Sequence, residues 1–512
     1  RMRLSAQPIL SHSDNLDLAF LLSPQALELL ASEMQNCSLK VVDQENSEFY
    51  LPMSELAEQA GAKISLNMVV LGGIVGFMQG DLTILNTIIR ENFQAKGEKI
   101  ININLEAARL GYEYVQKQQI SDFVCDFSQN DQKTKILVNG NQALALGAVQ
   151  AGLKLFAAYP MTPSSSIMTE LAVLAQDHEF TVHHVEDEIA AINMAIGGSF
   201  AGLRTATSTS GGGFALMTEA LGMAGMTEIP LVIYLVQRPG PSTGLPTKTA
   251  QGDLNLAVYS SQGDFPHLVL APGSVQSCFS LSKEAFTLAE KYQLPVIVLS
   301  DKYLADSEQS LILEDLDLTP PSPPIPFEAQ TSADRDFFPR YQDLGQGISP
   351  RTWPGIKDGH YIANSYEHQD TGEFAEEETE VVKMMAKREK KMQNLQKEIS
   401  SPQLFSENAD ILLLVWGGMT GPTREAQKQL VEEGIKCDLC QIQYLYPLSL
   451  QIPEIFQKYR KIIGIEGNES GQLSKLIASE FNLKVDLLIR NYWGRMPSAE
   501  WIVDSIKTQL NS

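Results

Sequence analysis

The chain is poor in cysteine and in long apolar runs. It has five cysteines in 512 residues, which argues against a disulfide framework and favours a reducing compartment. No apolar run reaches the ~18 residues that a membrane-spanning helix needs. Residues 1–15 are polar and lack the apolar segment of a signal peptide. A cytoplasmic protein that does not associate with membranes is therefore expected.

Positive charge is also scarce. The 39 Lys and Arg residues face 62 Asp and Glu residues, which gives a net charge of −23. Such a balance argues against nucleic acid or an anionic membrane as a partner. The remaining composition is that of a globular protein.

The sequence offers no cysteine set for a metal cluster. Cys437 and Cys440 form a lone Cys-x-x-Cys within the strand-like run Ile435–Ile442, where alternation would point them in opposite directions. A four-iron cluster needs four thiolates, and no second pair lies near the first in sequence. No metal site is therefore expected on this chain.

The length and the order of elements indicate a multi-domain α/β protein. Strand-like runs alternate with helix-like stretches over much of the chain, which favours a parallel sheet with helices on both faces. The expected divisions are a first unit at 1–118, a linker at 119–134, a main α/β domain at 135–316, an extended arm and helix at 317–404, and a compact α/β unit at 405–512.

A few segments carry specific predictions of secondary structure. Residues 65–77 and 81–93 read as helices, whereas Lys99–Leu105 looks like a strand followed by a helix. Glu376–Glu398 reads as a helix that is acidic first and basic later, as its dipole favours. Thr162 and Pro163 have the pattern of a helix start, with a hydroxyl N-cap before a proline at the first helical position.

The motifs with chemical content lie where apolar runs end, between residues 155 and 247. In open α/β sheets, ligands bind at the carboxyl ends of the strands. Glu188 opens a stretch that is almost entirely small or apolar, so we expect a buried helix with a carboxylate at its mouth. Such a carboxylate can share a proton with a ligand nitrogen. Asp187, next to it, reads as an acid that only offsets the helix dipole.

Arg238 ends the strand-like run 230–237 and enters a loop rich in Gly, Pro, Ser and Thr. A cation in that place suits a small carboxylate or phosphate. A surface arginine in a mobile loop is the alternative. The glycines at 211–213, before a predicted helix at 214–224, would let the backbone approach a ligand closely.

Four motifs in this order resemble the alpha subunits of 2-oxoacid:ferredoxin oxidoreductases, and the resemblance covers nearly the whole chain. It is greatest to the 2-oxoglutarate type, in which a gamma domain is fused ahead of alpha. The motifs are Tyr-Pro-Met-Thr-Pro-Ser-Ser, Glu-Asp-Glu-Ile-Ala, Arg-Pro-Gly-Pro-Ser-Thr-Gly-Leu-Pro-Thr and Gly-Ile-Ser-Pro-Arg. The resemblance implies a pyrimidine-type parallel sheet domain of thiamine diphosphate enzymes, a transketolase C-terminal-like domain, and a partial gamma domain that lacks its first strand-turn-helix.

The same resemblance implies an enzyme that decarboxylates a 2-oxoacid with thiamine diphosphate, forms an acyl-CoA and reduces ferredoxin. Glu188 is similar to the glutamate that protonates the cofactor's aminopyrimidine nitrogen. The residues expected to bind substrate are Thr162, Arg238, Ser242, Thr243 and Gly244. Those expected beside the cofactor, with Glu188, are Tyr159, Pro160, Gly212 and Phe214.

A missing motif suggests a partner. Thiamine diphosphate enzymes hold Mg²⁺ and the diphosphate through Gly-Asp-Gly and a later Asn, but this chain has only Gly-Asp-Leu (80–82 and 252–254) and Gly-Asp-Phe (263–265). The resemblance thus implies a beta subunit that supplies Mg²⁺ and the [4Fe-4S] cluster, in an (αβ)2 assembly. The alternatives are a subunit of a non-redox thiamine diphosphate decarboxylase or transketolase-like enzyme, and a non-catalytic assembly subunit.

Overall fold

The computed structural model describes residues 2–5, 7–31, 33–118, 133–321, 337–406 and 408–510. The expected linker at 119–134 lies outside these residues except for its last two positions. The chain divides into two compact units, each described by itself. The smaller unit comprises Leu4–Gln7 and Ser13–Gln132, and the larger comprises Arg1–Arg3, Pro8–His12 and Lys133–Ser512.

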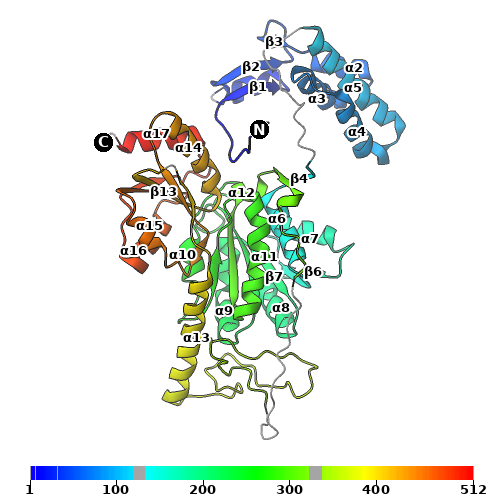
Figure 1. Ribbon diagram of the computed structural model, residues 1–512. Coiled ribbons are helices and arrows are strands. Elements are labelled where there is room, and N and C mark those ends of the chain that lie inside the picture. The colour runs from blue at the N-terminus through cyan, green and yellow to red at the C-terminus, as the bar shows by residue number, and fades with distance from the viewer. Residues whose placement is uncertain are drawn as a thin grey trace. The chain divides into compact units, whose positions relative to one another are not determined.

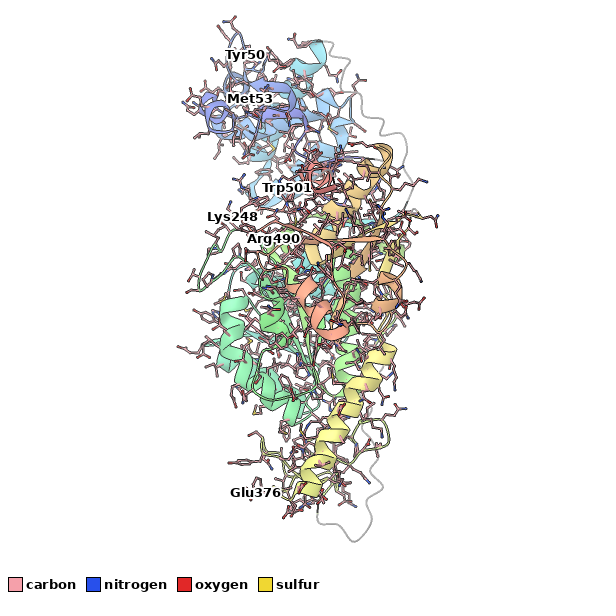
Figure 2. All side chains as sticks on the ribbon, turned by 90° about the vertical axis from the view of Figure 1, so that its left-hand side faces the viewer. Tyr50, Met53, Lys248, Glu376, Arg490 and Trp501 are labelled. Carbon is pink, nitrogen blue, oxygen red and sulfur yellow. The ribbon has the colours of Figure 1, made fainter. Side chains whose placement is uncertain are left out.

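The smaller unit is a short parallel sheet with helices. Its strands follow the order β1-β2-β3, and Tyr50 and Met53 in Figure 2 mark the passage from β3 to α2. The strands are β1 (Leu16–Leu21), β2 (Cys37–Val42) and β3 (Phe49–Tyr50), and the α-helices are α1 (Pro24–Leu29), α2 (Met53–Ala60), α3 (Leu66–Phe77), α4 (Leu82–Phe93) and α5 (Glu98–Lys117).

The predicted strand at Lys99–Leu105 is wrong, because this segment is the first part of α5. Its isoleucines suggested alternation, but the buried positions recur at helical spacing through Ile101, Asn104 and Ala108. Packing against α3 fixes the helix. A Cβ atom at Gly72 would lie 1.9 Å from the carbonyl oxygen of Ala108, and one at Gly111 would lie 2.0 Å from that of Val69. The two backbones are therefore in direct contact.

A seven-stranded sheet forms the centre of the larger unit (Figure 1). Its order is β15-β9-β10-β8-β7-β5-β6, and every pairing is parallel except that of β15 with β9. The predicted parallel sheet is confirmed. Its strands are β5 (Leu155–Ala158), β6 (Thr181–His184), β7 (Thr205–Thr209), β8 (Leu231–Gln237), β9 (Leu268–Leu270), β10 (Pro295–Asp301) and β15 (Tyr444–Tyr446).

Helices cover both faces of this sheet, so its strands are buried on two sides. One face packs on α6 (Gly140–Gln150), α7 (Ser165–Leu174) and α11 (Val275–Tyr292). The other packs on α8 (Glu188–Phe200), α9 (Gly211–Met226) and α10 (Leu254–Val258). The short pieces β4 (Lys135–Val138), α12 (Lys302–Asp306) and β11 (Gln309–Ile312) complete this part.

The C-terminal part has its own five-stranded sheet, ordered β12-β14-β13-β16-β17. Cys437 packs in the apolar cluster on one side of this sheet and Cys440 in the cluster on the other, as strand alternation predicts. The elements are β12 (Gln403–Phe405), β13 (Ile411–Trp416), α14 (Thr420–Glu432), β14 (Asp438–Ile442), α15 (Ile452–Phe456), β16 (Lys461–Glu466), α16 (Gln472–Phe481), β17 (Leu487–Arg490) and α17 (Ala499–Leu510).

Buried ion pairs hold the long helix α13 (Glu378–Glu398) to the main sheet domain. It is the long yellow helix of Figure 1. The carboxylate of Glu228, which is 1% exposed, accepts hydrogen bonds from Lys387 Nζ at 2.5 Å and Lys391 Nζ at 2.7 Å. Arg340, in the arm before α13, donates to the carbonyl oxygen of Glu228 at 2.6 Å. Burial opposes ionisation, but the two lysines hold the pKa of Glu228 well below its usual range.

Within the described residues, no helix combines the length and apolar character needed to cross a membrane.

Candidate active site

Glu188 is the first residue of α8 and lies at the carboxyl edge of the main sheet. Asp187 caps this helix, its Oδ1 accepting the N–H of Ala190 at 2.7 Å. The cap aligns the helix so that the Glu188 side chain points inward, where it is 3% exposed. Its Oε1 atom is buried and has no hydrogen-bond partner among the described residues. A buried carboxylate oxygen without a donor is costly, so a ligand that offers a donor there would bind favourably.

The first turn of α9 is shaped around this carboxylate. A Cβ atom at Gly213 would lie 2.4 Å from Glu188 Oε1 and 2.2 Å from Thr209 Oγ1, so only glycine leaves room for both groups. A Cβ atom at Gly212 would meet nothing closer than the carbonyl oxygen of Ser242 at 3.9 Å. The space beside Gly213 is therefore filled by Glu188 and Thr209, whereas the space beside Gly212 is free.

The predicted helix start at Thr162 and Pro163 is wrong, because α7 begins at Ser165. The preceding turn has its own hydrogen bonds. Ser164 Oγ donates to the carbonyl oxygen of Met161 at 2.8 Å, and Asn141 Nδ2 donates to that of Pro163 at 2.9 Å. The serine hydroxyl stabilises this turn and makes no side-chain cap bond to the helix. Thr162 is consequently left exposed at the edge of the sheet.

The structure brings Thr162 and Arg238 together. Arg238 follows β8, and its Nη1 donates to the carbonyl oxygen of Thr162 at 2.6 Å. The hydroxyl of Thr162 takes no part in this bond. The guanidinium has further N–H groups, since it carries five. The pair can thus present a cation and a hydroxyl to an anionic ligand.

The loop after Arg238 is compact. The N–H of Leu245 donates to the carbonyl oxygen of Pro239 at 3.0 Å. Gly244 has a φ of 54°, and a Cβ atom there would lie 1.7 Å from the same oxygen, so glycine is required. Ser242, Thr243 and Gly244 are all exposed. The loop therefore holds these residues beside Arg238 with their polar groups free to meet solvent or a ligand.

The other predicted residues divide into exposed and buried ones. Tyr159 and Pro160 are exposed at the end of β5, and the Tyr159 ring lies 6.2 Å from that of His184. Phe214, in the first turn of α9, is fully buried in the apolar cluster that includes residues of α8 and the main sheet. Its direct contact with a cofactor stays a prediction, and its evident role is packing.

Asp253 is a further candidate site residue that no sequence pattern indicated. Its carboxylate occupies the space over Gly211, where a Cβ atom would lie 2.6 Å from Asp253 Oδ2. This Oδ2 is buried and has no hydrogen-bond partner among the described residues. Burial raises the pKa of Asp253 to about 6, although Arg238 acts in the opposite sense. The residue belongs to the Gly-Asp-Leu at 252–254, whose one sequence signal is its difference from the magnesium motif Gly-Asp-Gly.

These features fit the aminopyrimidine of thiamine diphosphate better than they fit a metal ion. The site has two buried carboxylate oxygens without a hydrogen-bond partner among the described residues, Glu188 Oε1 and Asp253 Oδ2, and a glycine turn with open space at Gly212. In the part of the chain that the structure describes, no group of three or more His, Cys, Asp or Glu side chains is placed to hold a metal ion.

Comparisons with known proteins agree with this geometry. The alpha subunit of 2-oxoacid:ferredoxin oxidoreductase 2 from Aeropyrum pernix is 32% identical over 90% of this chain and 76% of its own length. The chain belongs to the 2-oxoacid:ferredoxin oxidoreductase family. Residues 146–388 match the family described as pyruvate flavodoxin/ferredoxin oxidoreductase, thiamine diphosphate-binding, and residues 1–114 match pyruvate ferredoxin/flavodoxin oxidoreductase.

Other members of the family are similar over most of their length. The 2-oxoglutarate synthase subunit KorA of Methanothermobacter marburgensis is 34% identical over 65% of this chain and 87% of its own. A solved 2-oxoglutarate:ferredoxin oxidoreductase from Magnetococcus marinus superposes with a TM-score of 0.90 at 32% identity, over 99% of this chain and 90% of that one. That structure contains 2-oxoglutarate, coenzyme A and succinyl-CoA. The Aeropyrum pernix and Magnetococcus marinus proteins are named ferredoxin oxidoreductases, and the Aeropyrum pernix and Methanothermobacter marburgensis proteins are named subunits. These names support the redox prediction over the non-redox alternative.

Proposed function

We propose that this chain is the alpha subunit of an enzyme that oxidises 2-oxoglutarate. The reaction is 2-oxoglutarate plus CoA plus two oxidised ferredoxins, giving succinyl-CoA, CO₂, a proton and two reduced ferredoxins. The proposal is supported by two residues that lie on the same edge of the sheet. Glu188 has a buried carboxylate oxygen without a hydrogen-bond partner among the described residues, and Arg238 follows a strand end and bonds to Thr162. The ligands in the Magnetococcus marinus structure support the choice of substrate.

Glu188 would hold the cofactor through a proton at Oε1. The chemistry that thiamine diphosphate supplies when bound is nucleophilic attack on a 2-oxo carbon and uptake of the electron pair that departing CO₂ leaves. Glu188 could give a proton to a ring nitrogen of that ligand and take it back, because its side chain is buried at the capped first turn of α8 and shielded from water. Gly212 and the exposed side of Tyr159 would line the approach.

Arg238 would bind a substrate carboxylate. Its guanidinium is oriented by the bond to Thr162 and pairs well with a carboxylate. Ser242 and Thr243 would add hydroxyl donors, and Gly244 keeps their loop in place. These residues orient the substrate next to the cofactor site.

A beta subunit would cover the site and supply Mg²⁺, the diphosphate ligands and a [4Fe-4S] cluster that passes electrons to ferredoxin. Large apolar side chains are exposed on the elements and loops that carry the site residues: Tyr159, Ile189, Met194, Leu216 and Leu245. So many exposed apolar groups beside a ligand site are typical of a surface covered in an assembly. An (αβ)2 arrangement follows from the resemblance to the family.

The test is to express this chain with the beta subunit of its source and assay the complex without oxygen. Reduction of ferredoxin or a viologen dye is measured with thiamine diphosphate, Mg²⁺, CoA and a panel of 2-oxoacids. We expect CoA-dependent reduction that is fastest with 2-oxoglutarate. A complex that binds thiamine diphosphate but reduces no acceptor would refute the proposal. Faster reduction with another 2-oxoacid would refute the assignment of 2-oxoglutarate as the substrate.

Replacing Arg238 with alanine should raise the KM for 2-oxoglutarate by about 10- to 100-fold, since a charge-assisted hydrogen bond is worth roughly 1.5–3 kcal/mol. Initial rates over a range of substrate concentrations check this value. Arg490→Ala is the control, because Arg490 is an exposed arginine on β17 that pairs with Glu469 (Figure 2). An unchanged KM in Arg238→Ala would contradict the assigned role.

A further inference from the structure

Asp253 is held in a segment that is anchored at three consecutive residues. Gln251 bonds to the C-terminal domain, its N–H donating to the carbonyl oxygen of Gly467 at 2.7 Å and its Nε2 to that of Trp416 at 2.8 Å. The carbonyl oxygen of Gly252 accepts Gln472 Nε2 at 2.8 Å. The position of Asp253 is therefore fixed by the fold.

The third residue of this segment, Asp253, is held by a hydrogen bond from its own backbone. Its N–H donates to Gln237 Oε1 at 3.0 Å, and Gln237 Nε2 in turn donates to the carbonyl oxygen of Ser300 at 3.1 Å. Gln237 is fully buried at the end of β8 and immediately precedes Arg238. The side chain that fixes Asp253 is thus adjacent in sequence to the arginine of the site.

The groups that the structure shows against Asp253 and its segment are uncharged. Gly211, in the first turn of α9, lies against the carboxylate. Gln237 accepts the N–H of Asp253, and Gln472 donates to the carbonyl oxygen of Gly252. Arg238 follows the Gln237 that holds the N–H of Asp253. Burial raises the pKa of Asp253, and the positive charge of Arg238 lowers it. Glu188 lies farther along the glycine turn, against Gly213. The buried, unpartnered Oδ2 therefore responds mainly to the charge of Arg238 and to whatever Arg238 binds.

We infer that Asp253 is a positioning residue that controls how strongly Arg238 attracts an anionic substrate. An ionised Asp253 partly neutralises Arg238 and repels a carboxylate at the same place, whereas a protonated Asp253 leaves the full positive charge to the substrate. The inference rests on the proposed function, because it takes the 2-oxoacid carboxylate as the anion.

This arrangement makes substrate affinity depend on pH in a defined sense. Because burial raises the pKa of Asp253 to about 6, the carboxyl group is protonated below that pH and ionised above it. The KM for a 2-oxoacid should therefore rise as pH increases through about 6. By linkage, a bound carboxylate also favours the protonated form of Asp253.

The experiment compares the wild-type alpha–beta complex with Asp253→Asn between pH 5.5 and 8. The wild-type KM for 2-oxoglutarate should rise about three- to tenfold over this range, the size of effect expected for one nearby charge partly exposed to water. In Asp253→Asn, which keeps the shape and removes the charge, KM should stay near the low-pH wild-type value while kcat changes little. Asp264→Asn, at an exposed aspartate, is the matched control and should follow the wild type.

Two outcomes would overturn the inference. One is a KM in Asp253→Asn that rises with pH in parallel with the wild type. The other is a KM above that of the wild type at every pH, which would mean that the carboxylate orients Arg238 for binding. If Asp253→Asn does not assemble, Asp253→Ser gives the same comparison. A wild-type complex that oxidises no 2-oxoacid would instead refute the proposed function.

Discussion

Glu188→Gln should lower kcat of the assembled complex by about two to four orders of magnitude, the range that a positioned acid–base group contributes. Glutamine has nearly the same shape but cannot carry the proton. In the structure the carboxylate oxygen Oε1 is buried, unpartnered and backed by Gly213. Steady-state turnover with 2-oxoglutarate measures the loss.

The matched control for this experiment is Glu186→Gln. Glu186 precedes the same helix by two residues, but its side chain is exposed. Its replacement should leave kcat within twofold of the wild type, an effect of roughly 0.4 kcal/mol at most. Size-exclusion chromatography establishes that both variants assemble with the beta subunit. Normal turnover in an assembled Glu188→Gln complex would show that the buried carboxylate does not serve the reaction.

Glu228→Gln should destabilise the chain by about 3–5 kcal/mol, because removal of one partner leaves buried charges uncompensated. Lys387 and Lys391 are 4% and 0% exposed, and both bond to this carboxylate. The substitution would loosen α13 and the arm from the main sheet. The shift of the urea midpoint, followed by far-UV circular dichroism, measures the effect.

Glu376→Gln is the control for stability. Figure 2 places Glu376 just before α13, and its side chain is exposed. Surface substitutions of this kind usually change stability by less than about 0.5 kcal/mol. If the two variants unfold at the same urea concentration, the buried ion pairs do not hold the helix as described.

Buried strands, and the residues that lie at the carboxyl ends of those strands, could be predicted from sequence. The strand-like run at 230–237 corresponds to β8 (Leu231–Gln237), because a short apolar run between turn residues permits few alternatives. The rule that ligands gather at carboxyl ends of parallel strands also placed Thr162, Glu188 and Arg238 on one edge. The hydrogen bond between Arg238 and Thr162 agrees with that expectation.

Other parts depend on tertiary contacts that local patterns do not contain. Lys99–Leu105 is helical because Gly72 and Gly111 allow α3 and α5 to touch, and those glycines are far apart in sequence. Ser164 could not be recognised as part of a turn, because its bond to Met161 competes with capping. Asp253 could not be assigned, since only the fold brings it over Gly211.

The strand β15 has a consequence for how such chains can be recombined. It comes from the C-terminal part of the sequence, yet it pairs antiparallel with β9 at the edge of the main sheet, with Tyr444 opposite Leu270. A chain cut before residue 405 would expose the backbone groups of β9, and an open strand edge invites aggregation. Chimaeras that exchange C-terminal parts between relatives should therefore remain in solution only where the foreign segment restores this pairing.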